Sequence, residues 1–269
     1  MLGIVSCLLR DNPEMVLCLA WTVSDFLTDE YRRVAQWSGG TNTVGDSEKQ
    51  IVESWQRNAG PWVAALDQQA IASRVAVTNG AIVNAVLSHH PQRVLDVGCG
   101  EGWLMRELAG HGVDVAGFDA VAELVAEAIA RGSKNCQCIA YEALDEVAWP
   151  QTFDLAVCNF SLLGESVEQP LRSLKQTLSA SGHLLVQTLH PCFITRGESY
   201  CSTWLKGSWE GLPDHLHRQF KDAPPWYFRT LSDWSFVFQK AGYSIAKIDE
   251  PSMDDGSLPL SILFQLRPV

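Results

Sequence analysis

The sequence is short of positive charge. It has 20 Lys and Arg residues against 31 Asp and Glu residues, which gives a formal net charge of -11 at pH 7. A protein that wraps a nucleic-acid backbone needs Lys and Arg to displace counterions. The composition therefore argues against nucleic acid as a partner, although it leaves a local basic patch open.

Long apolar runs are also missing. No stretch approaches the ~20 apolar residues that a transmembrane helix needs. The apolar start, MLGIVSCLLR, has no basic region ahead of it, which argues against a signal peptide. We therefore expect a cytoplasmic protein with no membrane partner.

The eight cysteines lack the spacing of zinc or redox motifs. Cys136 and Cys138 are separated by one residue instead of two, and no second pair matches them. Cys99, Cys138 and Cys158 lie inside apolar runs, which is typical of buried, reduced thiols in a protein of this size. We expect no disulfide framework and no metal site.

Residues 1–46 differ from the rest of the chain. Asn12-Pro13-Glu14 is typical of a helix start, and an apolar stripe at helical spacing runs from Val16 to Val34. Ser38-Gly39-Gly40 ends this pattern, and residues 41–49 are predicted to be a linker. The extension is expected to dock on the main domain or on a second subunit, which leaves a homodimer open.

Residues 47–269 are predicted to form one α/β domain. Residues 51–90 have helical spacing with a break at Gly60-Pro61, and apolar runs then alternate with amphipathic segments. This alternation predicts a doubly wound, mostly parallel sheet of seven strands with helices on both faces, a Rossmann-like fold. The parts are a helical cover (51–90), a core (93–189), an insertion (190–229) and a C-terminal helix with strands (230–269). The expected strands are 93–97, 113–118, 136–140, 153–158, 182–189, 243–248 and 258–266.

The most informative stretch is Val94-Leu-Asp-Val-Gly-Cys-Gly-Glu-Gly-Trp-Leu. An apolar strand leads into glycines at alternate positions and then into a helix, which favours a nucleotide-like ligand at the carboxyl ends of the strands. Dinucleotide loops have the pattern G-x-G-x-x-G, whereas this loop is G-x-G-x-G. Asp119 ends the second predicted strand, where an acid can bind both ribose hydroxyls or cap the next helix.

With an acid two residues before its first glycine, this loop resembles the first motif of class I S-adenosylmethionine-dependent methyltransferases. The resemblance covers residues 51–269 and implies S-adenosyl-L-methionine as the cofactor. It departs after the third strand, where the family usually has Asp and this chain has Tyr141 and Glu142. The implied cofactor-binding positions are Arg74, Asp96, Gly98, Cys99, Gly100, Gly102, Asp119, Ala120, Tyr141, Glu142, Asn159 and Phe160.

Some of these positions have a second interpretation. Arg74 would pair with the methionine carboxylate or lie on the surface, and Asn159 would lie beside the sulfonium or simply form a turn. Asn159-Phe160-Ser161 is not the [D/N]-P-P-[Y/F/W] motif of enzymes that methylate adenine or glutamine. This absence again favours a small-molecule acceptor.

His190 ends the fifth predicted strand, on the side where ligands bind in such sheets. It would act as a general base, since its ordinary pKa lies near neutral, or it would cap the strand end. The aromatic insertion after it is expected to be a lid over the substrate. The resulting hypothesis is direct in-line methyl transfer to a small molecule. The alternatives are an NAD-type oxidoreductase and a non-catalytic member of the same fold.

Overall fold

The computed structural model describes residues 44–194, 200–253 and 256–269. The helix predicted between Asn12 and Val34 lies outside these residues. Seven strands form one sheet in the order β3-β2-β1-β4-β5-β9-β8, and β9 runs antiparallel to both of its neighbours. The doubly wound, mostly parallel sheet is confirmed. Its strands are β1 (Arg93–Val97), β2 (Asp114–Asp119), β3 (Cys136–Cys138), β4 (Phe153–Asn159), β5 (Leu178–Leu189), β8 (Tyr243–Asp249) and β9 (Ser261–Pro268).

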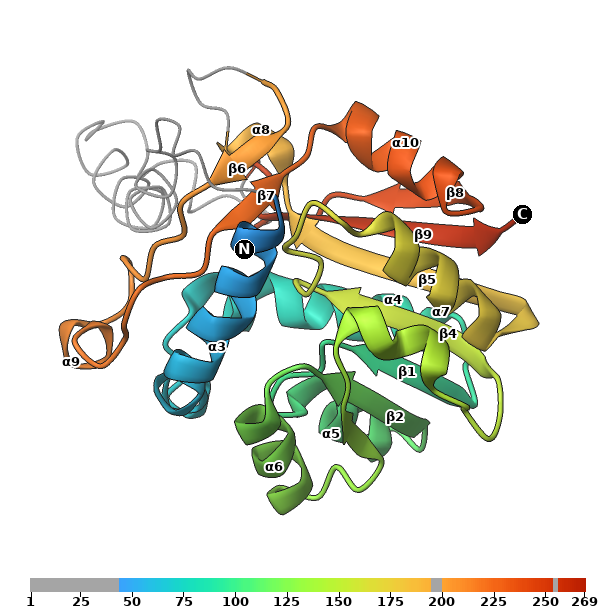
Figure 1. Cartoon of the computed structure of the whole chain (residues 1–269), viewed down its shortest axis with the longest axis horizontal. Helices are drawn as coiled ribbons and strands as arrows, with labels where there is room; N and C mark the ends of the chain where they lie inside the picture. The colour runs from blue at the N-terminus through green and yellow to red at the C-terminus, as the bar shows by residue number, and fades with distance from the viewer. Residues whose placement is uncertain (1–43, 195–199, 254–255) are drawn as a thin grey trace, which may run out of the picture.

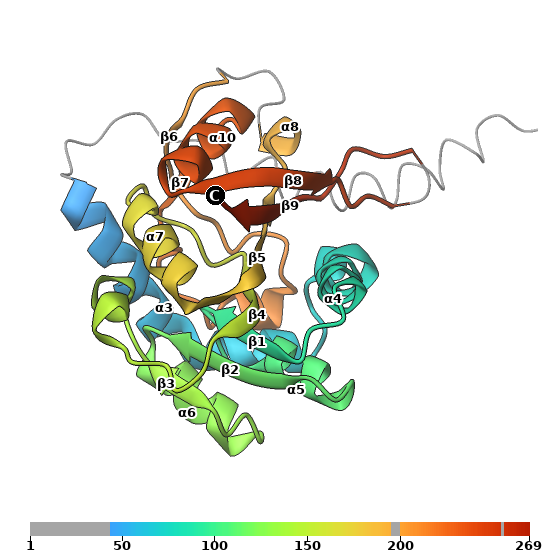
Figure 2. The same ribbon diagram turned by 90° about the vertical axis from the view of Figure 1, so that its right-hand side faces the viewer.

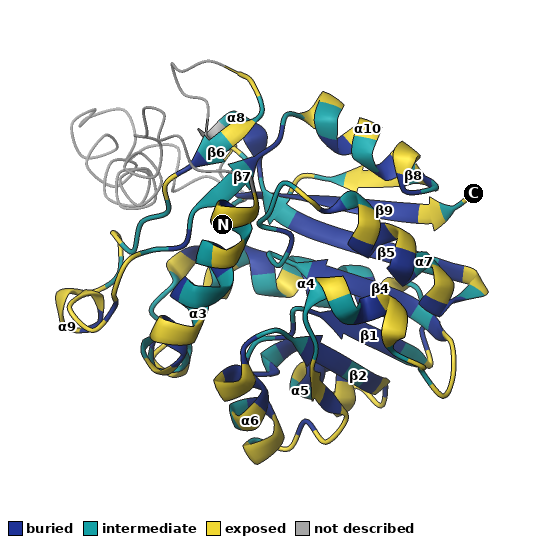
Figure 3. Cartoon of the chain, viewed as in Figure 1, coloured by how far each residue is buried: buried dark blue, intermediate teal, exposed yellow. Residues whose placement is uncertain are grey.

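Helices cover both faces of the sheet, as Figure 2 shows. Neighbouring strand residues point to opposite faces, so Leu95 packs in the apolar cluster with Trp234 and Val94 packs in the cluster with Leu104. Figure 3 shows the central strands buried between these layers, whereas the edge strands β3 and β8 are largely exposed. The first face carries α7 (Glu168–Thr177) and α10 (Leu231–Lys240); the second carries α4 (Asn79–Ser88), α5 (Trp103–Gly110) and α6 (Ala122–Ala130).

The predicted break at Gly60-Pro61 is wrong, because α3 (Val44–Asp67) runs straight through it. Pro61 removes one backbone donor, but burial of Ala59 with Val121 and Leu124 on α6 keeps the helix in place. The predicted linker is also too long, since α3 already begins at Val44. The chain leaves the helix after Asp67 and forms a π-helix, η1 (Arg74–Thr78), that leads into α4.

The carboxyl ends of the parallel strands face α3 and the 190–229 insertion, on the left in Figure 1. Trp209 of the insertion packs on Trp55 of α3, with ring centroids 5.6 Å apart, and Asn58 Oδ1 accepts the Lys221 N–H (2.7 Å). These contacts fasten the insertion to α3. It contains α8 (Pro191–Ile194), α9 (Asp214–His217) and a two-stranded antiparallel sheet of β6 (Thr203–Leu205) and β7 (Trp226–Phe228).

Cys99, Cys136 and Cys158 are buried thiols that form no disulfide. The expected burial of Cys138 is wrong, because it lies on β3 at the edge of the sheet and is exposed. In the part of the chain that the structure describes, no helix is long and apolar enough to cross a membrane. No cluster of three or more His, Cys, Asp or Glu residues suited to a metal ion occurs there either.

Candidate functional site

The loop between β1 and α5 is built on three glycines with left-handed backbone. Their φ angles are 70° at Gly98, 56° at Gly100 and 79° at Gly102, a region that residues with a side chain rarely adopt. The N–H groups of Gly98 and Cys99 both donate to the Phe118 carbonyl of β2, at 2.9 and 3.0 Å. The sequence therefore forms a tight loop at the carboxyl ends of two adjacent strands.

Two of the three glycines, Gly98 and Gly102, are closely packed by neighbouring side chains, whereas Gly100 is not. A Cβ added to Gly98 would overlap the Cβ of Ser161, and one added to Gly102 would lie 2.6 Å from Ser133 Oγ. At Gly100 nothing lies within 4 Å of an added Cβ. The open side of Gly100 leaves room for a ligand to approach the backbone.

Asp119 organises this loop from the end of β2. Its Oδ2 accepts the Gly100 N–H and its Oδ1 accepts the Val121 N–H at the start of α6, both at 2.9 Å. Burial raises the pKa of the carboxyl, and the backbone donors oppose that shift. The Oδ1 contact is made to Val121, the N-cap residue of α6, so Asp119 fixes the turn that leads into the helix. This role is compatible with ribose binding, because each carboxylate oxygen keeps a second lone pair.

Asp96 is the acid that precedes the loop, and it lies 2% exposed on β1. Its Oδ2 is buried with no hydrogen-bond partner in the described structure. Burial raises its pKa to about 8, and the like charges of Asp119 and Glu101 add to the effect. A buried acid of this kind is suited to receive a cationic ligand.

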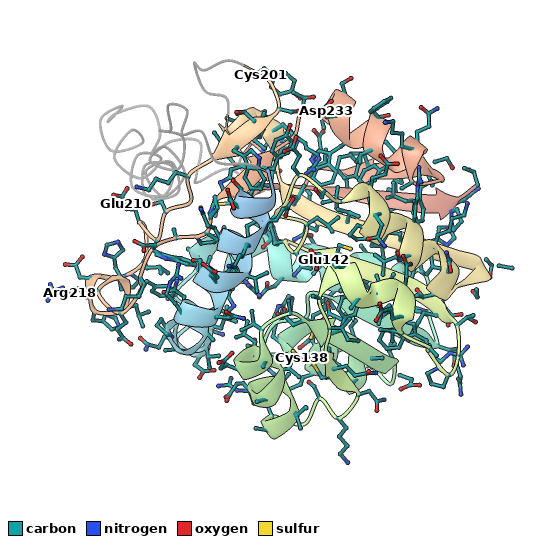
Figure 4. All side chains as sticks on the ribbon, in the orientation of Figure 1. Cys138, Glu142, Cys201, Glu210, Arg218 and Asp233 are labelled. Atoms are coloured by element: carbon teal, nitrogen blue, oxygen red, sulfur yellow. The ribbon has the colours of Figure 1, made fainter. Side chains whose placement is uncertain are left out.

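Several predicted cofactor residues surround the loop, but their side chains have different environments. The Cys99 thiol packs in the core, 3.3 Å from Cys136 Sγ, and lies 3.8 Å from the Gly100 carbonyl. Tyr141 donates to the Ser161 carbonyl at 3.2 Å, and burial raises its pKa. Glu142 is exposed on the segment after β3 (Figure 4), and Ala120, which follows Asp119, is partly buried.

The end of β4 is strained next to the loop. Phe160 has a positive φ of 55°, which is uncommon for a bulky residue, and its N–H donates to the Gln187 carbonyl at 2.8 Å. The Oδ1 of the preceding Asn159 is buried without a partner in the described residues. Strain and an unpartnered amide beside a glycine loop are typical of functional sites.

Arg74 begins the π-helix η1, and its guanidinium lies between two indole rings. Its Cζ is 5.5 Å from the centre of the Trp62 ring and 5.1 Å from that of Trp103. Burial lowers its pKa to about 10, while Glu101 opposes the shift. It is therefore not the free surface arginine of the alternative interpretation.

A cavity of about 280 Å³ is lined by Arg74 together with Glu101 and Trp103. Arg106 in its wall pairs with Glu101 at 2.6 Å, and Arg131 pairs with Asp67 at 2.5 Å. Among the described residues, Arg74 is thus the arginine of this cavity that has no carboxylate partner. Nothing in the sequence pointed to the two tryptophans that hold it.

His190 is 4% exposed, and both of its ring nitrogens have contacts. Nδ1 accepts the Cys192 N–H at 3.1 Å, so Nε2 carries the proton and donates to Glu250 Oε1 at 2.7 Å. Glu250 follows β8 and was not expected here. These contacts favour the capping alternative, and the role of His190 as a base stays a prediction.

The insertion adds a charged and aromatic cluster near the end of β4. Arg229 lies between the rings of Tyr227 and Trp234, at 4.8 and 4.9 Å, and donates to the Glu165 carbonyl at 2.5 Å. The Glu165 carboxylate accepts the Trp204 Nε1–H at 3.1 Å. Most aromatic side chains of the insertion therefore pack internally and fix it over the loop that follows β4.

The glycine loop, the acid at the end of β2 and the strand order all have parallels in known proteins. The sequence profile described as "Methyltransferase domain" matches residues 69–247, more than half of the chain. The chain belongs to this methyltransferase family. The family prediction is thus confirmed, and the NAD-type oxidoreductase has no support from this match.

Relatives of this methyltransferase domain include ubiquinone biosynthesis O-methyltransferases. That of Xanthomonas oryzae pv. oryzae (strain PXO99A) is 34% identical over 115 residues, 40% of this chain and 47% of the relative. That of Aliivibrio fischeri (strain MJ11) is 34% identical over 108 residues, 37% of this chain and 44% of the relative. The chain thus spans about half the length of the curated relatives it matches.

Solved structures agree on the fold. The Burkholderia thailandensis 1,6-didemethyltoxoflavin-N1-methyltransferase, bound to 1,6-didemethyltoxoflavin and S-adenosylhomocysteine, has a TM-score of 0.60 at 15% identity. The match covers 87% of this chain and 93% of that one. An S-adenosylmethionine-dependent methyltransferase from Mesorhizobium loti has a TM-score of 0.51 at 24% identity, over 68% and 96% of the two chains. Identities this low show the fold alone.

Proposed function

We propose that this protein transfers a methyl group from S-adenosylmethionine to a small-molecule acceptor by direct in-line displacement. The observation that carries the proposal is the hydrogen-bonded unit of the glycine loop and Asp119, in a chain of the methyltransferase family. The names of the relatives support it, since they are O-methyltransferases. A structural neighbour that methylates a nitrogen leaves the acceptor atom open.

The residues around the loop fit the cofactor. The open side of Gly100 admits close approach, and Asp119 has lone pairs left for the ribose hydroxyls. Arg74 offers a cation for the methionine carboxylate, while Asp96 offers a carboxyl group for the ammonium. When bound, the cofactor supplies a methyl group that its sulfonium has already activated.

The protein's own part is binding, alignment and exclusion of water. Tyr141, Glu142 and Ala120 follow β2 and β3, where they would border the adenine. Asn159 and Phe160 end β4, where they would border the methyl group. Trp55 of α3 and Trp209 of the insertion pack together, and we expect this contact to help exclude water from the site. A homodimer and the lack of a nucleic-acid partner stay predictions.

The direct test is methyl transfer from labelled S-adenosylmethionine to a metabolite library. We expect labelled product from one chemical class of acceptor, with no added metal. If S-adenosylhomocysteine binds but no acceptor is labelled, the result supports the non-catalytic alternative instead.

Cofactor binding should release a proton from Asp96. Its pKa of about 8 keeps the free carboxyl protonated at pH 6.5, and a bound cation would favour the carboxylate. Between pH values of about 4 and 8 we therefore expect release of up to about one proton per S-adenosylhomocysteine bound. Calorimetry in buffers of different ionisation enthalpy measures this release. Asp96→Asn should abolish it, and an equal release in the variant would rule out Asp96 as its source.

Two variants test whether His190 caps the strand end or acts as a general base. In His190→Asn the new amide oxygen can still accept the Cys192 N–H, so we expect a methyl-transfer rate within about tenfold of the wild type. His190→Ala loses this hydrogen bond, so we expect it to be less stable than the wild type. A general base would instead cost about 10²–10⁴ in rate in both variants. Single-turnover rates and urea unfolding of the two variants decide between the roles.

A further inference from the structure

Three polar side chains share one face of the sheet, where β4 and β5 end, and the π-helix η1 packs beside them. Asn159 on β4 is paired with Gln187 on β5, and the register of β5 with β9 places Ser261 diagonally beside Gln187. Gln187 and Ser261 share their face with Leu185 and Leu263, which belong to the cluster under α4. Thr78 of the π-helix η1 joins them, since its carbonyl accepts Gln187 Nε2–H at 3.0 Å.

Each of these side chains keeps a buried polar atom that has no partner in the described structure. The atoms are Thr78 Oγ1, Asn159 Oδ1, Gln187 Oε1 and Ser261 Oγ. Thr78, Gln187 and Ser261 are 2%, 1% and 0% exposed. Unpartnered buried polar atoms are rare in folded proteins, because each is costly to desolvate. Four together indicate a place where a polar ligand group completes the hydrogen bonding.

Two members of this cluster, Gln187 and Ser261, lie away from the cofactor residues, whereas Asn159 borders both groups. Asp119 and the glycine loop lie at the ends of β1 and β2, on one side of β4. Gln187 and Ser261 lie on β5 and β9, on the other side of β4. With the methyl group presented near Asn159, the cluster faces the acceptor. This step rests on the proposed function.

The chemistry of the cluster selects the ligand group. Gln187 already uses its N–H₂ group toward Thr78, so its Oε1 is left as an acceptor. The four residues carry no charge. We propose that Thr78, Asn159, Gln187 and Ser261 bind a neutral hydroxyl or amino group of the methyl acceptor. A carboxylate would face the Gln187 oxygen without a counter-charge. The π-helix that carries Thr78 is a feature often found at functional sites.

The test uses the full chain saturated with S-adenosylhomocysteine and four probes: phenol, aniline, anisole and benzoate. Ligand-observed NMR titration should show phenol and aniline binding at least about fivefold tighter than anisole, which lacks the donor, and than benzoate, which is charged. The double variant Thr78→Val/Ser261→Ala should weaken phenol about fivefold, as expected for lost neutral hydrogen bonds. Its affinity for S-adenosylhomocysteine should stay within about twofold.

Stability gives a second readout. Thr78→Val and Ser261→Ala remove hydroxyls whose oxygens have no partner, so the Tm should hold or rise. The matched controls are Thr177→Val and Ser173→Ala, because these buried hydroxyls donate to the Leu174 and Gln169 carbonyls at 2.8 and 3.1 Å. The controls should lower the Tm by about 2–4 °C each.

The outcomes separate the two proposals. If S-adenosylhomocysteine itself does not bind, the proposed function fails. If it binds but phenol is no better than anisole, or the double variant binds phenol as the wild type does, the acceptor site is overturned. A Tm loss in Thr78→Val and Ser261→Ala as large as in the controls would also overturn it, since the hydroxyls would then be structural.

Discussion

Asp119→Ala is expected to weaken S-adenosylhomocysteine binding about 10- to 150-fold, or about 1.5–3 kcal/mol. The carboxylate holds the N–H groups of Gly100 and Val121 and is the group placed to accept the ribose hydroxyls. Its loss removes charge-assisted hydrogen bonds and loosens the glycine loop at the same time. Isothermal titration of the folded variant measures the change.

The matched control is Asp114→Ala. Asp114 is an exposed acid at the other end of the same strand, so its removal changes the net charge equally but leaves the loop alone. We expect its affinity to match the wild type. Equal affinities of the folded Asp119→Ala and Asp114→Ala variants would reduce Asp119 to a residue that fixes the turn into α6.

Gly98→Ala is expected to destabilise the fold by about 2–5 kcal/mol and to abolish measurable cofactor binding. The backbone at residue 98 has a φ of 70°, which alanine rarely adopts, and the new methyl group would overlap the Cβ of Ser161. Strain and overpacking therefore act together at the centre of the site. Urea unfolding and titration with S-adenosylhomocysteine measure the two effects.

Two further variants separate these causes. Gly98→Ala/Ser161→Gly removes the overlapping atom. It should regain the part of the unfolding free energy lost to overpacking, but not the part lost to backbone strain. Gly80→Ala is the control within α4, where an added Cβ meets nothing within 4 Å. It should stabilise the helix by about 0.5–1 kcal/mol. A Gly98→Ala protein as stable as the wild type would contradict the loop geometry.

The fold was predictable because each strand is a short apolar run with a helix after it. The glycine spacing also predicted where the backbone would need left-handed angles. Predictions from the local sequence were wrong where contacts between distant residues determine the structure. Pro61 does not break α3, since burial of Ala59 against α6 outweighs the lost hydrogen bond. On the edge strand β3 the first residue, Cys136, is buried and the last, Cys138, is exposed, and an apolar run shows neither the strand order nor where the cover ends.

The site was predictable where its residues are close in sequence. Asp96 lies on β1 just before the loop that carries the three glycines, and Asp119 ends the next strand. Long-range pairs gave no signal: Glu250 meets His190 from 60 positions away, and Gln187 meets Thr78 from 109 positions away. The pairing of strands and helices creates these contacts, so they appear only once the chain is folded.

The central claim is that the loop and Asp119 hold S-adenosylmethionine, and one titration tests it most directly. Isothermal titration of the full chain with S-adenosylhomocysteine should give a micromolar Kd, a binding free energy of roughly -7 to -9 kcal/mol. Parallel titration with NADH should give no binding at the same concentrations. Binding of NADH, with none of S-adenosylhomocysteine, would contradict the account.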